Sequence, residues 1–242
     1  MIMKAIQYCM LITLMLLPAG MPSSAIAAGD RNILFREDFN SLDNWKPFFF
    51  PKIQKHSTYT IETNGQDHIL KAESSGSASA IVYKDSFNVY EHPRVKWRWK
   101  AGNVYKKGDA RTREGDDYPV RVYIMFEYDP EQAGAFEKVK YGMAKSIYGA
   151  YPPHSSLSYV WANKDDSDRF LTSPYTNKAK MVLLEGAQKA GTWQDEAINI
   201  LEDYEQAFGI KPPARARIAV MNDSDNTGES SASYMDYIEI FR

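Results

Sequence analysis

Apolar side chains recur at every second position along several stretches of the chain, and this period constrains the possible folds more than any other feature. Val95, Trp97, Trp99 and Ala101 share one face of an extended segment, and the residues between them are lysine or arginine. Side chains of a β-strand alternate between two faces, so this segment is predicted to be a strand with one buried face. Trp97 and Trp99 are therefore expected in the core. The same alternation occurs in residues 120–126, 157–161, 218–220 and 234–240.

Shorter candidate strands complete the pattern, at residues 33–39, 59–63, 69–73, 78–83 and 180–184. Clusters of Gly, Asn, Asp and Pro separate the runs, as in antiparallel sheets with one buried face. So many runs exceed one ordinary open sheet, and two packed sheets are expected. No internal repeat or long linker divides the chain, which predicts a single β-sandwich domain over residues 28–242.

Two segments depart from this period and are predicted to be inserted helices. The first is expected to begin at Asp129, with Pro130 at the first helical position and Gln132 completing a capping box, and to end at Gly149. Its apolar residues at helical spacing are Phe136, Val139, Met143 and Ile147. The second is expected near residues 199–208 and stops at Gly209; its apolar face consists of Ile200, Leu201, Tyr204 and Phe208.

The N-terminal segment is typical of a cleaved secretory signal peptide over residues 1–27. Lys4 precedes an apolar run at residues 5–17, and small residues surround an A-x-A-like cleavage site after Ala27. The run is too short to cross a bilayer, and no later run of about 18 apolar residues follows, so no membrane span is expected. The mature protein is predicted to be periplasmic or secreted.

Composition excludes several classes of site. Cys9 is the only cysteine and lies in the predicted signal peptide, which excludes disulfides, thiolate zinc ligation, thiol catalysis and an iron–sulfur cluster in the mature chain. The histidines lack a zinc-binding spacing and no phosphate-binding glycine motif is present, so neither zinc nor a nucleotide is expected. A Ser-His-Asp triad stays open, because such triads assemble from distant segments. With 31 acidic residues against 29 basic ones, nucleic acid is not an expected partner.

An acidic loop follows the strand that ends near Met221. Its sequence Asn-Asp-Ser-Asp-Asn-Thr-Gly-Glu places Asp223, Asp225 and Thr227 at alternate positions. Oxygen ligands at this spacing can wrap Ca²⁺, as in the first half of an EF-hand loop, although Tyr234 stands where that loop needs its bidentate glutamate. The alternative is a turn between two strands, for which these residue types are common. Calcium is the only cofactor that the sequence suggests.

A second charged segment, residues 108–118, leads into the strand that carries Arg121. Asp109 and Asp117 are candidate ligands for sugar hydroxyls. Adjacent Asp116 and Asp117 cannot face the same side of an extended strand, so a catalytic carboxylate pair would need Asp117 with Asp223 or Asp225 across the sheet. The alternative is a charged, solvated connection.

Arg98 and Arg121 stand at mid-strand, opposite apolar residues. Both are predicted to line the open face of one sheet, with Tyr123 beside them, where guanidinium groups can pair with ligand carboxylates. The alternative is an ordinary solvent-exposed face. Aromatic rings could stack on sugars or fill the core; the undecided candidates are Trp161, Trp193, Tyr175 and residues 48–50.

The order of these motifs resembles the exported bacterial family named domain of unknown function 3047, over residues 35–242. Ala197 departs from the resemblance, because a basic residue is expected there. The family name implies no activity. The blocks that carry the resemblance are Trp97-Arg98-Trp99-Lys100, Gly115-Asp116-Asp117, Arg121-Val122-Tyr123, Tyr159-Val160-Trp161, Glu202-Asp203-Tyr204 and Asp225-Asn226-Thr227-Gly228.

A looser resemblance concerns the first and last strands. The segments Arg36-Glu37-Asp38-Phe39 and residues 235–240 are similar to the terminal strands of jelly-roll carbohydrate-binding modules. This resemblance implies a jelly-roll fold and makes Glu37 and Asp236 candidate ligands of a structural calcium ion. It is an analogy between folds, and such folds carry many functions.

Together, these observations predict an antiparallel jelly-roll β-sandwich that binds a glycan or a small anionic sugar on a polar face. One alternative is a polysaccharide-degrading enzyme, either a lyase with Tyr123 as base or a hydrolase with two carboxyl groups. Another is a non-catalytic envelope protein that binds a protein partner. The predicted ligand-binding residues are Arg98, Asp109, Asp117, Arg121, Tyr123, Trp161 and Asn226, and the predicted metal ligands are Asp223, Asp225, Thr227, Glu37 and Asp236.

Overall fold

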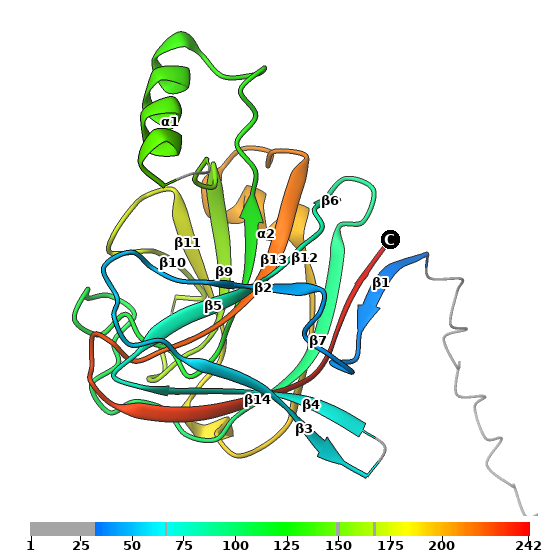
Figure 1. Cartoon of the computed structure of the whole chain (residues 1–242), viewed down its shortest axis with the longest axis vertical. Coiled ribbons are helices and arrows are strands. Elements are labelled where there is room, and N and C mark those ends of the chain that lie inside the picture. Colours follow the sequence, from blue (N-terminus) through cyan, green and yellow to red (C-terminus); the bar gives the residue numbers. More distant parts are fainter. Residues whose placement is uncertain (1–31, 66, 149–150, 167) are drawn as a thin grey trace, which may run out of the picture. The chain divides into compact units, whose positions relative to one another are not determined.

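The structure is a computed structural model that describes residues 32–65, 67–148, 151–166 and 168–242. Residues 32–242 form one compact unit (Figure 1). The predicted signal peptide and its cleavage site lie outside the described residues. Two helices and two β-sheets make up the described unit, and a short 3₁₀ turn occupies Ala187–Lys189.

The first sheet, here called sheet A, is six-stranded and antiparallel throughout. Its strands lie in the order β12-β7-β14-β4-β3, and β1 pairs with β14. The strands are β1 (Ile33–Glu37), β3 (Thr58–Asn64), β4 (Asp67–Ser75), β7 (Arg94–Ala101), β12 (Gln194–Asn199) and β14 (Ser230–Phe241).

The second sheet, sheet B, is eight-stranded, in the order β10-β11-β9-β8-β13-β5-β2, and β6 pairs with β13. One pair departs from the predicted antiparallel pattern: β11 is parallel to β9. After β9 the chain forms the edge strand β10. It then turns back as β11, which lies between β10 and β9 and is antiparallel to β10. The strands are β2 (Trp45–Phe48), β5 (Ala78–Tyr83), β6 (Phe87–Asn88), β8 (Arg121–Phe126), β9 (Ser155–Trp161), β10 (Phe170–Thr172), β11 (Ala179–Glu185) and β13 (Arg215–Asp223).

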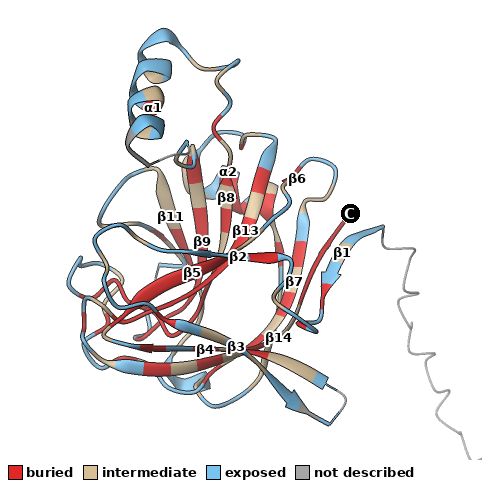
Figure 2. Ribbon diagram, viewed as in Figure 1, coloured by how far each residue is buried: buried red, intermediate tan, exposed pale blue. Residues whose placement is uncertain are grey.

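The core lies between the inward faces of the two sheets. Trp99 of sheet A meets Trp161 of sheet B with ring centroids 5.7 Å apart, and Trp97 meets Tyr159 at 5.5 Å. All four rings are fully buried, and burial alternates along the strands in Figure 2. The predicted β-sandwich of jelly-roll type is confirmed, as is the core position of Trp97 and Trp99. Successive strands cross repeatedly from one sheet to the other, for example from β13 to β14.

The second predicted helix is confirmed as α2 (Ile200–Phe208). The Asn199 side chain accepts a hydrogen bond from the Leu201 backbone N–H at 3.1 Å, which satisfies one free donor of the first turn. Gly209 ends the helix in the left-handed conformation with φ 72°, which a residue with a Cβ adopts only at a cost.

The first predicted helix starts later than expected, at Ala135, and α1 extends over Ala135–Tyr148. Asp129 instead closes a separate turn, because its carboxylate accepts hydrogen bonds from the Glu131 backbone N–H at 2.9 Å and the Gln132 side chain at 2.8 Å. The predicted stop at Gly149 lies outside the described residues. None of the helices in the described part of the chain has the length and hydrophobicity needed to cross a bilayer.

The apolar stripe of α1 does not enter the core. Phe136, Val139 and Met143 are exposed, and α1 projects beyond the ends of the sheet B strands (Figures 1 and 2). The helix is held on its other side by Tyr141, which stacks on Tyr128 with ring centroids 3.8 Å apart.

Candidate functional site

The outer face of sheet B, opposite the core, carries a cavity of about 480 Å³. Its floor comes from five neighbouring strands, β5, β13, β8, β9 and β11. Strand pairing puts the floor residues in rows: Met221 lies opposite Ala80 on one side and opposite Arg121 on the other. Alternate positions of each strand therefore supply the floor, whose residues are Ala78, Met221, Arg121, Tyr123, Ser158, Met181 and Ala179.

The side walls of the cavity are largely apolar and come from two connecting segments. On one side, Phe50 and Ile53 follow the end of β2 and, like Tyr123, pack against the cluster of Ala78, Ala80 and Met221. On the other side stands Tyr175, whose ring is half exposed. The Tyr175 hydroxyl lies 3.1 Å from the Arg113 carbonyl oxygen, which fixes the ring at the cavity rim. An exposed aromatic ring facing an apolar wall provides the kind of surface on which a sugar ring packs.

The polar end of the cavity is built on a buried ion pair. Arg121 of β8 and Asp223 of β13 lie in neighbouring strands, on the outward face of both. Arg121 Nε donates to Asp223 Oδ1 at 2.9 Å, and Arg121 Nη2 donates to Asp223 Oδ2. Asp223 Oδ1 also accepts a hydrogen bond from the Tyr118 backbone N–H at 3.2 Å. The Asp223 carboxylate is thus satisfied from within the protein.

Asp116 lies on the other side of the same guanidinium group. Its backbone carbonyl accepts a hydrogen bond from Arg121 Nη2 at 3.0 Å, and its Oδ1 stands 3.5 Å from Arg121 Nη1. Asp116 is 6% exposed, lines the cavity, and its Oδ1 has no hydrogen-bond partner. Burial raises the pKa of Asp116, and neighbouring Asp117 adds to the increase. Asp116 therefore brings to the cavity lining a buried carboxylate oxygen whose hydrogen-bonding capacity is unused.

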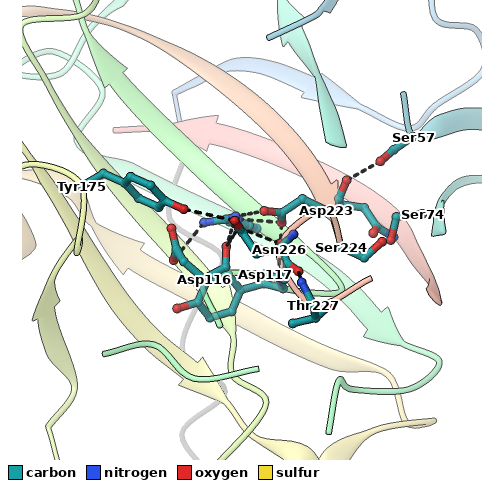
Figure 3. A network of polar contacts seen from close by, with 12 residues as sticks. Ser57, Ser74, Asp116, Asp117, Tyr175, Asp223, Ser224, Asn226 and Thr227 are labelled. Carbon is teal, nitrogen blue, oxygen red and sulfur yellow. Dashed lines mark hydrogen bonds and ion pairs between the residues drawn. The ribbon is translucent and has the colours of Figure 1, made fainter. Parts of the chain in front are cut away.

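Asp117 holds the acidic loop through its side chain (Figure 3). Its Oδ2 accepts a hydrogen bond from the Thr227 backbone N–H at 2.6 Å, and its Oδ1 accepts from the Asn226 side chain at 3.1 Å. On the core side, Ser57 Oγ donates to the Asn222 carbonyl at 2.7 Å. The loop is thus anchored by Asp117, and the strand that leads into it by Ser57.

One group of carboxylates could hold a metal ion. Among the described residues, one group of three potential metal ligands is found: Asp117, Asp223 and Asp225. Each has a carboxylate oxygen within 4.8 Å of the others. Burial raises the pKa of Asp225, and the nearby charge of Asp117 raises it further, so this end of the cavity carries excess negative charge. Thr227 belongs to the same loop, and its hydroxyl oxygen accepts a hydrogen bond from the Glu229 backbone N–H at 3.3 Å.

The other predicted metal ligands lie elsewhere. Glu37 is buried, with Oε1 accepting from the Phe39 backbone N–H at 2.8 Å and Oε2 from Trp45 Nε1 at 3.0 Å. Asp236 pairs with Arg98 at 3.4 Å on the outer face of sheet A. Neither belongs to the carboxylate group described above.

The predicted ligand-binding residues separate into two sets. The structure brings Asp117, Arg121, Tyr123 and Asn226 to the polar end of the cavity or its edge. Arg98 lies on β7 of sheet A, so the prediction that it shares one sheet face with Arg121 is wrong. Alternation within a strand shows which side chains share a face, but it does not show to which sheet the strand belongs.

Two further predicted residues lie away from the cavity lining. Trp161 is fully buried, and its Nε1 donates to the Gly186 carbonyl at 3.1 Å, so its ring serves the core. Asp109 caps its own loop through the Arg111 backbone N–H at 3.0 Å and pairs with Lys164 at 3.2 Å. The loop is tight here, because a Cβ on Gly115 would stand 2.5 Å from the Asp109 nitrogen.

Several cavity residues were not predicted from the sequence. At the cavity the outward residues of β5 and β9 are small, Ala78, Ala80 and Ser158, which leaves room for a ligand. The sequence shows this only as a lack of charge on a solvent-side face. Asp116 was considered only as part of an adjacent pair. The unpredicted lining residues are Lys52, Ile53, Ala78, Asp116, Ser158, Ser173, Ala179, Met181 and Met221.

Comparison with solved structures returns glycan-related folds. A family 11 carbohydrate-binding module from Clostridium thermocellum, in complex with a β-1,3-1,4-mixed-linked tetrasaccharide, has a TM-score of 0.40 at 10% identity, covering 87% of this chain and 94% of that one. Endoglucanase 3 of Trichoderma harzianum has a TM-score of 0.44 at 8% identity, covering 89% of this chain and 100% of that one. Identities this low concern the fold alone.

Comparison with curated proteins gives no significant match. A family comparison gives one: the family described as protein of unknown function (DUF3047) matches residues 43–239, which is most of the chain. The match confirms the resemblance read from the order of the motifs. The chain belongs to the DUF3047 family.

Proposed function

We propose that the cavity on the outer face of sheet B binds a segment of a glycan. The observation that carries the proposal is that one cavity of about 480 Å³ combines an apolar wall with carboxylate oxygens that have unused hydrogen-bonding capacity. A sugar ring needs both, because its C–H face is apolar and its rim carries hydroxyl groups. Pockets of this size with a few placed polar groups are typical of small-ligand sites.

In this proposal each wall has a defined task. Tyr175 and Phe50 pack against the faces of the sugar ring, and Asp116 Oδ1 and Asp225 accept hydrogen bonds from its hydroxyls. Arg121 acts as a positioning residue, since its donors are directed at Asp223 and Asp116. Tyr123 lies on the floor between Arg121 and Met125 of the same strand.

The test is removal of the exposed wall. Tyr175→Ala should weaken binding to a responsive polysaccharide by about tenfold or more, because stacking contributes on the order of 1–1.5 kcal/mol beyond buried area. Tyr90→Ala is the matched control, since Tyr90 is 45% exposed against 51% for Tyr175 and does not line the cavity. Binding would be measured by calorimetry, with new reducing ends assayed in the same samples. Equal affinity of Tyr175→Ala and the unchanged protein would refute the site.

The second part of the proposal is that Asp117, Asp223 and Asp225 bind Ca²⁺. Hard carboxylate oxygens suit Ca²⁺, and a cation would offset the negative charge that raises the pKa of Asp225. At 100 times its dissociation constant, Ca²⁺ should raise Tm by roughly 5–10 °C. Identical melting curves in Ca²⁺ and in chelator would exclude this ion, and Asp225→Asn should abolish any shift that is seen.

Export completes the proposal. The predicted signal peptide over residues 1–27 would place the mature chain in the periplasm or outside the cell, where polysaccharides are available. N-terminal sequencing of the protein recovered from a periplasmic extract tests this directly. A mature N-terminus at Ala28 is expected, and recovery of the uncleaved chain from the cytoplasm would contradict it.

No paired carboxylates support hydrolysis at the positions considered in the sequence. Asp117, Asp223 and Asp225 gather one carboxylate oxygen each within 4.8 Å of one another, as cation ligands do. Asp117 and Asp223 are also held by internal donors. Binding without cleavage is therefore the proposed outcome of the reducing-end assay.

A further inference from the structure

The polar end of the cavity has a marked charge imbalance. Asp116, Asp117, Asp223 and Asp225 converge there, and Arg121 is the basic residue among them. Lys52 also lines the cavity, but it is exposed at the rim, where solvent screens its charge. Lys107, which donates to the Thr227 carbonyl at 3.1 Å, and Arg113, which lies over the Tyr175 ring, are likewise exposed. In the buried part of this end, the carboxylates therefore face one guanidinium group and leave an excess of negative charge.

Arg121 has little capacity to receive an acidic ligand. It is 5% exposed, its Nε and Nη2 donate to the two oxygens of Asp223, and Nη2 also donates to the Asp116 carbonyl. Nη1 faces Asp116 Oδ1. A bidentate contact with a ligand carboxylate needs two free, parallel N–H groups, which the guanidinium group does not have while Asp223 is bound.

The remaining polar groups of the cavity are acceptors. Asp116 lines the cavity, and its buried Oδ1 lacks a hydrogen-bond partner. Asp225 lines the same cavity. A ligand hydroxyl would satisfy either carboxylate by donating its proton. A ligand carboxylate or sulfate would instead bring a further negative charge against them in a partly desolvated space.

From this geometry we infer that the cavity selects a glycan segment without acidic groups and discriminates against uronates and sulfated sugars. This inference rests on the proposed function and narrows its substrate class. It also revises the expectation from the sequence that Arg121 is free to pair with a ligand carboxylate, because Arg121 already pairs with Asp223 and Asp116.

The test uses matched oligosaccharides that differ only at C6, which carries a hydroxymethyl group in one and a carboxylate in the other. Soluble oligomers of glucan, xylan, mannan and galactan would be screened, and the C6 hydroxyls of each binding hexose oligomer would then be oxidised to carboxylates. We expect the oxidised oligomer to bind at least about tenfold more weakly at low salt. The difference should narrow as NaCl is raised, because salt screens the repulsion. Binding of the neutral and of the oxidised oligomer would each be measured in Ca²⁺ and in chelator.

Asp225→Asn provides the matched variant, since it removes one charge but keeps the shape and one acceptor oxygen. It should reduce the difference between the neutral and the oxidised oligomer several-fold. Asp67→Asn, an exposed carboxylate on β4 of sheet A, is the control and should leave the difference unchanged. An unfolded variant would be recognised by its melting curve, and the comparison of oligomers on the unchanged protein still decides the question.

The outcomes separate the two proposals. Weaker binding of the oxidised oligomer supports the inference. Equal or tighter binding overturns the inference but leaves glycan binding intact, and so does binding of acidic polysaccharides only. Failure of every neutral and acidic oligomer to bind refutes the proposed function itself, and the inference with it.

Discussion

Arg121 and Asp223 face each other across β8 and β13 and are joined through both carboxylate oxygens, with side chains that are 5% and 2% exposed. A buried ion pair costs desolvation when it forms, and breaking it is costly because one charge is left alone. This pair therefore fixes the cavity floor and the start of the acidic loop in one step. It also explains why a buried arginine can sit on the outward face of a sheet.

Removing one member of this pair should destabilise the whole protein. Asp223→Ala leaves Arg121 buried without its main partner and is expected to lower the free energy of unfolding by about 3–5 kcal/mol. Denaturant unfolding measures the change. Glu62→Gln is the control, because Glu62 pairs with Lys71 at 3.1 Å while 49% exposed, and exposed pairs contribute about 0–1 kcal/mol. Similar losses for both variants would contradict the structural role of the buried pair.

Asp117 should act as an anchor for the acidic loop. Its carboxylate accepts hydrogen bonds from the Asn226 and Thr227 backbone N–H groups, and Asp117→Ala leaves these donors without a partner. We expect a loss of about 1–3 kcal/mol. Asp117→Asn keeps one acceptor oxygen and should lose less. Amide hydrogen exchange at residues 224–228 would locate the effect, and unchanged protection there would argue against an anchoring role.

The sequence was sufficient for the long strands and the core, but not for β2, β6, β10 and β12 or for the division of the strands between two sheets. Alternation around Trp97 and Trp99 correctly predicted a strand with a buried face, because burial of one face imposes a period of two residues. It could not show that Arg98 and Arg121 belong to different sheets, since sheet membership depends on contacts between distant segments. The parallel pairing of β9 and β11 could not be predicted for the same reason.

The site was partly predictable for a similar reason. Asp223 and Asp225 could be predicted as metal ligands because acidic residues alternate in one loop, and such a local pattern is visible in the sequence. Ser158 and Met181 line the cavity only because β9 and β11 are neighbours, and neither residue type suggests binding by itself. Arg121 was correctly placed on an outward face, but its partners at positions 116 and 223 could be identified only from the folded chain.

The exposed stripe of α1 gives a prediction about stability. Helical spacing of Phe136, Val139 and Met143 predicted the helix, yet their exposed fractions are 86%, 62% and 63%. Substitution of Phe136 by Ser should therefore change the free energy of unfolding by less than about 0.5 kcal/mol. Tyr141→Ala, which removes a buried ring stacked on Tyr128, should cost about 3 kcal/mol. A large cost for Phe136→Ser would show that the stripe is covered in solution.

Glu196 gives a prediction about pH. The carboxyl group lies at the edge of sheet A, where Trp99 Nε1 donates to its Oε1 at 3.1 Å. Burial raises the pKa of Glu196 to about 7, and the negative charge of Glu185 contributes to the increase. A carboxyl group whose pKa is raised on folding binds a proton more tightly in the folded state. Its contribution to stability is therefore fully present at pH values below about 4.5 and is lost as the pH rises through about 7.

Glu196→Gln should accordingly stabilise the protein in alkaline solution and have little effect in acid. Glutamine keeps an oxygen for the Trp99 N–H and carries no charge to desolvate. The expected gain at pH 8.5 is about 1 kcal/mol, because solvent still reaches part of the carboxyl group. Glu205→Gln, on the exposed side of α2, is the control. Denaturant titrations at pH 4 and pH 8.5 measure both variants. A gain at pH 4 equal to that at pH 8.5 would mean that packing, and not charge, separates the variant from the unchanged protein.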